Sequence, residues 1–171
     1  MKRKIIMTLA AAAAAVLFTS GMAVTPSNAT PSDGFVGTQI SKGFFGPLSL
    51  NANKVQDKSD KWDFKLQTTG DSDLYVTRNA ISAGGSSGWH THPGPSLVTV
   101  TVGEIAVYDG DDPACPRTVY KAGQGSVDIG GGAVHLVRNE SGAPAETVSV
   151  QMIPTGAARR IDAPKPTNCP D

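Results

Sequence analysis

The sequence has 171 residues, with 15 basic and 15 acidic side chains and 39% hydrophobic residues. This length allows one domain with a substantial core and is short for two. The basic residues form no patch or long run, which excludes an extended basic surface for nucleic acid.

The chain begins with a segment typical of a secretory signal peptide. Residues 2–4 are basic, residues 5–18 are mostly apolar, and small residues then offer a cleavage point between Ala29 and Thr30. The apolar run is shorter than the roughly 20 residues of a membrane-spanning helix, so a membrane anchor is the weaker alternative. We predict that residues 1–29 are a signal peptide, that the protein is secreted or extracytoplasmic, and that no membrane association follows cleavage.

The remainder of the chain is slightly acidic. Removing residues 1–29 from the 171 leaves 142 residues, with 12 basic and 15 acidic side chains and a net charge near −3. These residues contain no long charged block and no acidic tail.

Short strands separated by glycine-containing turns follow the signal segment. Residues 30–73 are predicted to be an N-terminal extension with one or two strands, one of them around Trp62. Residues 74–154 hold the strongest strand patterns, such as VTVTV, EIAVY, AVHLVRN and AETVSVQMIP, and residues 155–171 form a proline-rich C-terminal tail. No long stripe of helical period is present, so the pattern predicts an all-β sandwich or barrel.

The predicted mature chain contains two cysteines, Cys115 and Cys169, each beside a proline. An even number of cysteines outside the cell favours a disulfide between them. Two free thiols, or soft ligands of a metal, are the alternatives. The paired spacing of a cysteine metal site is absent.

The three histidines of the chain lie in two short stretches. In GWHTHPGPS, His90 and His92 are separated by one residue, so on a strand both side chains point to the same face. Two imidazoles in this arrangement can bind one metal ion as neighbouring ligands, and the following Pro-Gly-Pro stiffens the turn. His135, which follows a glycine-rich turn, is the candidate third ligand.

These stretches resemble the two sequence motifs of the cupin family. In the first motif the pair His90 and His92 fits, and Gly103 fits, but Ser96 stands where the family usually has glutamate.

The second cupin motif fits around the remaining histidine. Residues 130–132 are glycines, followed by His135 and, at the expected spacing, Asn139. A glycine replaces the usual proline, and the leading glycine, Gly125, sits one residue closer than the pattern expects. The resemblance covers about residues 74–154.

The resemblance implies a cupin-type jelly-roll β-barrel that holds one divalent transition metal ion through His90, His92 and His135. Ser96 is a poor substitute for a carboxylate ligand, so the ion would have more open positions for water or substrate. By strand parity, Ser96 shares the barrel interior with Val98, Val100 and Val102. Three neutral imidazoles suit Zn, Fe(II), Cu, Ni or Co better than Mg or Ca. The ion expected here is Fe, Zn, Mn, Ni or Cu. Many cupins pair their sheets, so the resemblance leaves a homodimer open.

Other residues near the motifs receive ordinary structural roles. Trp89 is expected to pack away from the metal, Asn139 to bond the turn that follows it, and Arg138 to face solvent or an edge. Glu104 and Asp128 are candidates for a general acid or base, although no motif places either of them.

The resemblance and the residues together are compatible with two main classes of function, and in both the partner is a small molecule. One is a metal-dependent enzyme, an oxygenase or a related isomerase or lyase. The other is a non-catalytic module that binds a sugar or an organic acid. A metal that only stabilises the fold is a third, weaker reading. The missing glutamate favours a binding module, whereas the complete set of histidines favours an enzyme.

Overall fold

The computed structural model describes residues 29–52 and 64–169. The predicted signal peptide, apart from Ala29, and the predicted strand centre at Trp62 lie outside these residues. The described residues contain strands, turns and bends but no helix, so the all-β prediction is confirmed. None of them forms a helix with the length and apolar character needed to cross a membrane.

Most of the described residues belong to strands. In chain order the strands are β1 (Asp33–Phe45), β2 (Ser49–Ala52), β3 (Phe64–Gln67), β4 (Ser72–Ser86), β5 (His90–Thr91), β6 (Ser96–Val102), β7 (Glu104–Asp109), β8 (Arg117–Lys121), β9 (Gly125–Asp128), β10 (His135–Arg138), β11 (Ala145–Pro154) and β12 (Ile161–Asp162).

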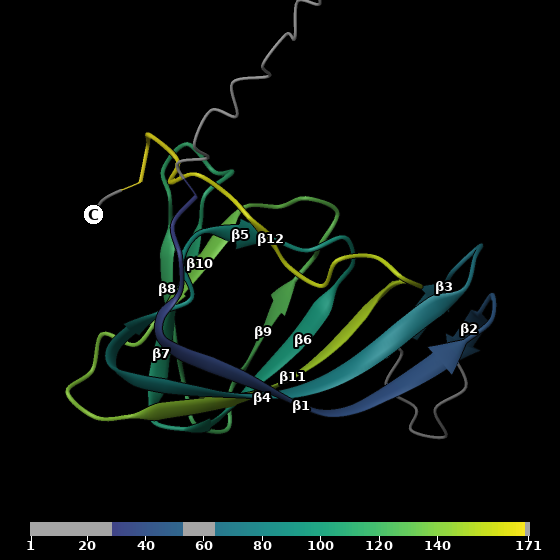
Figure 1. The fold of residues 1–171 in the computed structure, drawn as a ribbon, viewed down its shortest axis with the longest axis horizontal. Helices are drawn as coiled ribbons and strands as arrows, with labels where there is room; N and C mark the ends of the chain where they lie inside the picture. Colours follow the sequence, from purple (N-terminus) through teal and green to yellow (C-terminus); the bar gives the residue numbers. More distant parts are fainter. Residues whose placement is uncertain (1–28, 53–63, 170–171) are drawn as a thin grey trace, which may run out of the picture.

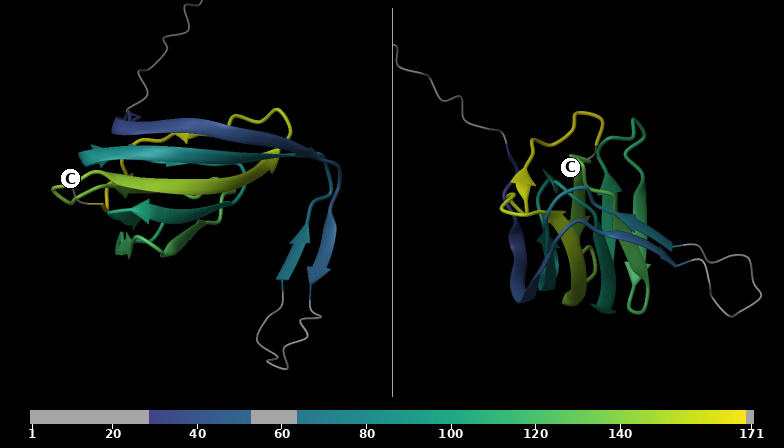
Figure 2. Two further views of the ribbon diagram at one scale, coloured as in Figure 1. Left: turned by 90° about the horizontal axis from the view of Figure 1, so that it is seen from below. Right: turned by 90° about the vertical axis from the view of Figure 1, so that its right-hand side faces the viewer.

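One large antiparallel sheet curls into the barrel of a jelly roll (Figure 1). Its hydrogen-bonded order is β12-β5-β10-β4-β11-β6-β9, with β1 added to β4, while β7 joins β10 to β8. The β2–β3 hairpin forms a separate two-stranded sheet, and Figure 2 shows it projecting away from the barrel. This curling brings strands from distant parts of the chain to face one another across the barrel interior.

The sheet extends beyond the predicted barrel range of 74–154 at both ends. Strand β1 pairs with β4 along nearly its whole length, from Asp33 opposite Ser86 to Phe45 opposite Ser72. Residues 33–45 of the predicted N-terminal extension therefore form a full strand of the barrel sheet.

Along β6, side chains alternate between the barrel interior and the outside, as predicted, up to a β-bulge near the end of the strand. Ser96 and Val100 are buried, as predicted, but Val102 is 51% exposed. The pairing with β11 shifts because Thr101 is an extra residue, so the side chains beyond it change face. The inward orientation predicted for Val102 is therefore wrong.

The apolar core lies in two clusters of buried side chains. One surrounds Trp89 and contains Tyr108, Leu136 and both cysteines, which confirms the packing role expected for Trp89. The other cluster consists of Ile81, Val100, Ile105 and Ala145.

Asn139 holds the turn before β11. It is completely buried, its amide donates to the carbonyls of Ser82 and Ala143, and its Oδ1 accepts from the Ser141 backbone. The structural role predicted for Asn139 is confirmed.

The C-terminal segment packs against the barrel. Strand β12 pairs with β5, placing Asp162 opposite His90, and the Ala163 backbone donates to the Trp89 carbonyl. Cys169 forms a disulfide with Cys115, 54 residues away in sequence. The segment predicted as a tail therefore covers one end of the barrel, and its disulfide is compatible with an extracytoplasmic location.

Candidate metal centre

The three histidines converge inside the barrel, as their motifs predict. His90 lies on β5, His92 directly follows that strand, and His135, the first residue of β10, pairs with His90 across the sheet. Their ring centroids lie 4.3 to 5.2 Å apart. Each histidine offers a ring nitrogen, and these three atoms lie within 4.8 Å of one another.

Backbone carbonyls fix the orientation of all three imidazoles. Each ring directs its Nδ1 at a carbonyl oxygen, so Nδ1 carries the proton and Nε2 keeps its lone pair. The acceptors for His90, His92 and His135 are Gly88, Arg159 and Ala133, at 2.8, 2.5 and 3.2 Å, respectively. This arrangement leaves three Nε2 atoms free to ligate.

Burial keeps at least two of these imidazoles neutral. Desolvation by burial, aided by the nearby positive charge of Arg160, lowers the pKa of His90 to about 2. Burial also lowers the pKa of His92, although its hydrogen bond to the Arg159 carbonyl and the nearby Asp128 oppose this effect. Neutral imidazole is the form that binds a metal ion.

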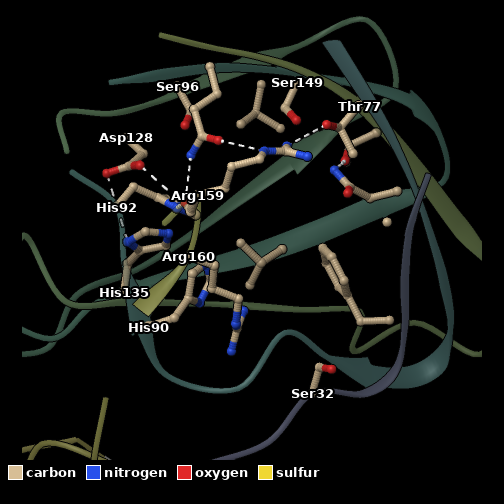
Figure 3. Close-up of a pocket in the computed structure, with 17 residues that line it drawn as sticks. Ser32, Thr77, His90, His92, Ser96, Asp128, His135, Ser149, Arg159 and Arg160 are labelled. Carbon is tan, nitrogen blue, oxygen red and sulfur yellow. Dashed lines mark hydrogen bonds and ion pairs between the residues drawn. The ribbon is translucent and has the colours of Figure 1, made fainter. Parts of the chain in front are cut away.

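A polar cavity of about 310 Å³ extends from the histidines into the barrel. Strands β4 and β11 contribute Thr77, Asn79, Thr147 and Gln151 to its lining, and Figure 3 shows Thr77 and Ser149 among the residues around it. A cavity of this size suits a small molecule.

Two arginines from the C-terminal segment enter this cavity. Arg159 donates to Thr77 Oγ1 at 2.6 Å and to Gln151 Oε1 at 3.2 Å (Figure 3). Both partners are neutral, and burial lowers the pKa of the Arg159 guanidinium. Arg160 donates Nε to Asp162, whereas its Nη2 is buried with no hydrogen-bond partner among the described residues. The cavity therefore carries positive charge with donor capacity to spare.

Asp128 is the carboxylate closest to the histidines. Its side chain is 11% exposed, with one oxygen 3.8 Å from His92 Nε2 and the other 3.8 Å from His135 Nδ1 (Figure 3). Glu104, the other acid–base candidate, is 40% exposed and lies 3.7 Å from Lys121 Nζ, and it does not line the cavity.

The residues present fit a divalent transition metal ion. The three free Nε2 atoms supply imidazole donors of the kind that such ions prefer. Asp128 Oδ2 is buried without a hydrogen-bond partner among the described residues, as expected of a carboxylate oxygen that can ligate a cation. Ser96 is buried in the cavity wall as its parity predicts.

Sequence reasoning missed Arg159 and Arg160 and left Asp128 without a place. The arginines lie in a proline-rich segment without periodicity, which carries no signal for the barrel interior. Asp128 lies between Val127 and Ile129, which are 66% and 75% exposed, so the usual alternation is inverted there.

A family model described as a cupin domain matches residues 79–151, a range that contains all three histidines. No curated protein matches the chain.

Several solved structures are similar to this chain at low sequence identity. The cupin domain of an XRE-family transcriptional regulator from Enterobacter cloacae is 16% identical, with a TM-score of 0.44, over 70% of this chain and 96% of that one. A Klebsiella pneumoniae protein with a double-stranded β-helix domain is 23% identical, with a TM-score of 0.45, over 69% and 84%. The polyketide cyclase RemF from Streptomyces resistomycificus is 19% identical, with a TM-score of 0.43, over 50% and 58%.

At these identities and TM-scores the likeness assigns no activity to this chain. The family model, the two histidine motifs and the jelly-roll barrel agree with one another. Residues 79–151 of this chain therefore form a cupin domain.

Proposed function

We propose that this protein is a secreted, metal-dependent cupin that binds and transforms a small anionic molecule. One divalent transition metal ion would be held by His90, His92 and His135. The reaction would be that of an oxygenase, an isomerase or a lyase. The observation that carries the proposal is the convergence of three oriented imidazoles on a cavity that also contains two arginines.

The bound ion supplies Lewis-acid chemistry, which polarises a coordinated oxygen or activates oxygen or water. The chain's own residues would bind and orient the molecule. The free donor of Arg160 Nη2 suits a carboxylate oxygen, because charge-assisted hydrogen bonds of this kind are strong. Thr77 and Gln151 accept hydrogen bonds from the Arg159 guanidinium and would hold it in the cavity.

The metal part of the proposal is tested by the metal content of the purified protein. We expect one equivalent of Fe, Zn, Mn, Ni or Cu per chain, measured by mass spectrometry of the digested protein. The variant His92→Ala loses an imidazole donor and should lose most of this metal. A native protein that takes up no stoichiometric transition metal would contradict the proposal.

The anionic character of the ligand is tested with acetate, malonate and succinate beside their neutral amides. We expect calorimetry on the metal-loaded protein to detect the acids and not the amides. Arg160→Gln should weaken acid binding by at least about 10-fold, as expected for loss of a charge-assisted bond. Arg78→Gln removes the same charge from the exposed pair with Glu146 and serves as the control. Equal binding of acids and amides would overturn this part.

A non-catalytic binding module is the second candidate. Among the described residues that line the cavity, Asp128 is the one carboxylate, and it lies against the histidines. If Asp128 interacts with the metal or the histidines, the described lining of the cavity has no second carboxylate for proton transfer. Binding of a carboxylate without turnover, in the presence of oxygen and the loaded metal, would decide for this candidate.

A further inference from the structure

We propose that Asp128 is a fourth protein ligand of the metal centre, supplied by the strand beside Ser96. This inference rests on the proposed metal-binding function. It concerns a residue to which neither histidine motif assigns a role.

The register of the sheet brings Asp128 to this position. Ser96 on β6 pairs with Asp128, the last residue of β9. Residues directly opposite on antiparallel strands lie about 4.5–5.5 Å apart and project from the same face. Asp128 and Ser96 therefore both face the cavity, and both line it.

The two carboxylate oxygens of Asp128 have different environments. Oδ1 accepts the Gly130 backbone N–H at 2.9 Å, which fixes the rotation of the carboxyl group. Oδ2 is buried and has no hydrogen-bond partner among the described residues. A buried carboxylate oxygen without a donor is costly, so this atom requires a partner that the protein itself does not supply.

The unpartnered oxygen lies beside a free ligand atom. Oδ2 is 3.8 Å from His92 Nε2, the nitrogen that remains available because Nδ1 is bonded to the Arg159 carbonyl. A cation between Oδ2 and Nε2 would satisfy both atoms. It would also offset the buried negative charge of the carboxylate.

The inference is tested with the variant Asp128→Asn, which keeps the shape and the acceptor oxygen and removes the charge. We expect its affinity for Co(II), measured by competition with a chelator, to fall by at least about 10-fold. The visible absorption of bound Co(II) should also change, because one ligand is lost. A merely positioning role would leave this spectrum unaltered, since the acceptor oxygen remains.

Two further variants sharpen the test. Asp111→Asn is the matched control, because Asp111 accepts from the Val134 backbone next to His135 and does not line the cavity. Its Co(II) affinity should stay within about 2-fold of the native value. Ser96→Glu, added to Asp128→Asn, returns a carboxylate from the neighbouring strand and should recover affinity.

The outcomes separate this inference from the proposed function. Co(II) binding that is lost in His92→Ala but unchanged in affinity and spectrum in Asp128→Asn would overturn the inference alone. No Co(II) binding by the native protein would overturn both. Reduced affinity and an altered spectrum in Asp128→Asn, with a native-like circular dichroism spectrum, would support the assignment.

Discussion

Asp73, at the start of β4, is a buried carboxylate that depends on a neighbouring strand for its counter-ion. It is 1% exposed, and Lys42 Nζ on β1 lies 2.9 Å from its Oδ2. The Gly156 backbone and the Tyr75 hydroxyl also donate to that oxygen, at 3.3 and 3.5 Å. The hydrogen bond from Lys42 holds the pKa of Asp73 below its ordinary value of 3.8, although burial opposes this shift.

This shift predicts a loss of stability in acid. Because the folded pKa is depressed, the contribution of Asp73 is fully present above the ordinary value of 3.8 and disappears as pH falls through the folded value. Asp73→Asn should therefore lower the melting temperature at pH 7 and flatten its decline between about pH 5 and pH 2. Thermal unfolding followed by circular dichroism measures both effects. Asp71→Asn, two residues earlier and exposed, is the control, and an equal acid slope in all three proteins would refute the prediction.

At the scale of elements, two loops meet beside the histidines at a pair of glycines. Gly130, with φ +66°, packs so closely that an added Cβ would lie 2.2 Å from the carbonyl carbon of Gly94. Gly132 also donates to the His92 carbonyl at 3.1 Å. The turn before β10 and the turn after β5 are therefore held in contact, and each carries a histidine of the site.

Gly130→Ala should separate these two loops, whereas Gly131→Ala should not. Both positions have a positive φ, so each alanine meets about 1–2 kcal/mol of backbone strain. Only Gly130→Ala adds the clash with Gly94, since a Cβ at Gly131 has nothing within 4 Å. We expect urea unfolding to show a loss of about 1–2 kcal/mol for Gly131→Ala and about 2–5 kcal/mol for Gly130→Ala. Metal affinity should fall in Gly130→Ala alone, and equal effects of the two variants would argue against the coupling of the loops.

At the scale of the whole molecule, the disulfide joins the last described residue to a loop in the middle of the chain. Cys169 and Cys115 are 6% and 5% exposed and belong to the core cluster around Trp89. The bridge closes a loop with a sequence separation of 54. A constraint on a loop of this length stabilises the fold mainly by restricting the unfolded chain.

Replacement of both cysteines by serine should lower the free energy of unfolding by about 2–4 kcal/mol. Urea unfolding of the native and double-serine proteins, each with and without dithiothreitol, measures the difference. Reductant should weaken the native protein and leave the double-serine variant unchanged. If dithiothreitol left the free energy of unfolding of the native protein unchanged, the disulfide would contribute nothing to stability in solution.

Much of the fold and three residues of the site could be predicted from local sequence features. The alternating strands, the glycine turns and the spacing around His90, His92 and His135 are short-range patterns. Asp128 could be named as a candidate, but its place beside the histidines could not be predicted, because its inward position depends on pairing with Ser96 and on two apolar neighbours that face outward. Strand alternation assumes that apolar residues face the core, and this strand inverts that assumption.

The C-terminal segment was beyond prediction for a different reason. Arg159 and Arg160 reach the cavity because β12 pairs with β5 and a disulfide holds the residues that follow. These constraints act between residues far apart in the sequence. Residues 155–169 have no regular alternation of apolar and polar residues from which a strand or an inward-facing side chain could be predicted. The secreted location, the homodimer and the metal ligation stay predictions.

The hydrogen bond from His92 to the Arg159 carbonyl has a consequence for where this domain ends. The family match stops at residue 151, eight residues before that carbonyl. A chain shortened to residues 79–151 would keep all three histidines. It would lose the Arg159 carbonyl, which orients His92, and the side chains of Arg159 and Arg160, which line the cavity. We therefore expect a fragment that ends at residue 151 to bind metal more weakly than one that extends through Cys169.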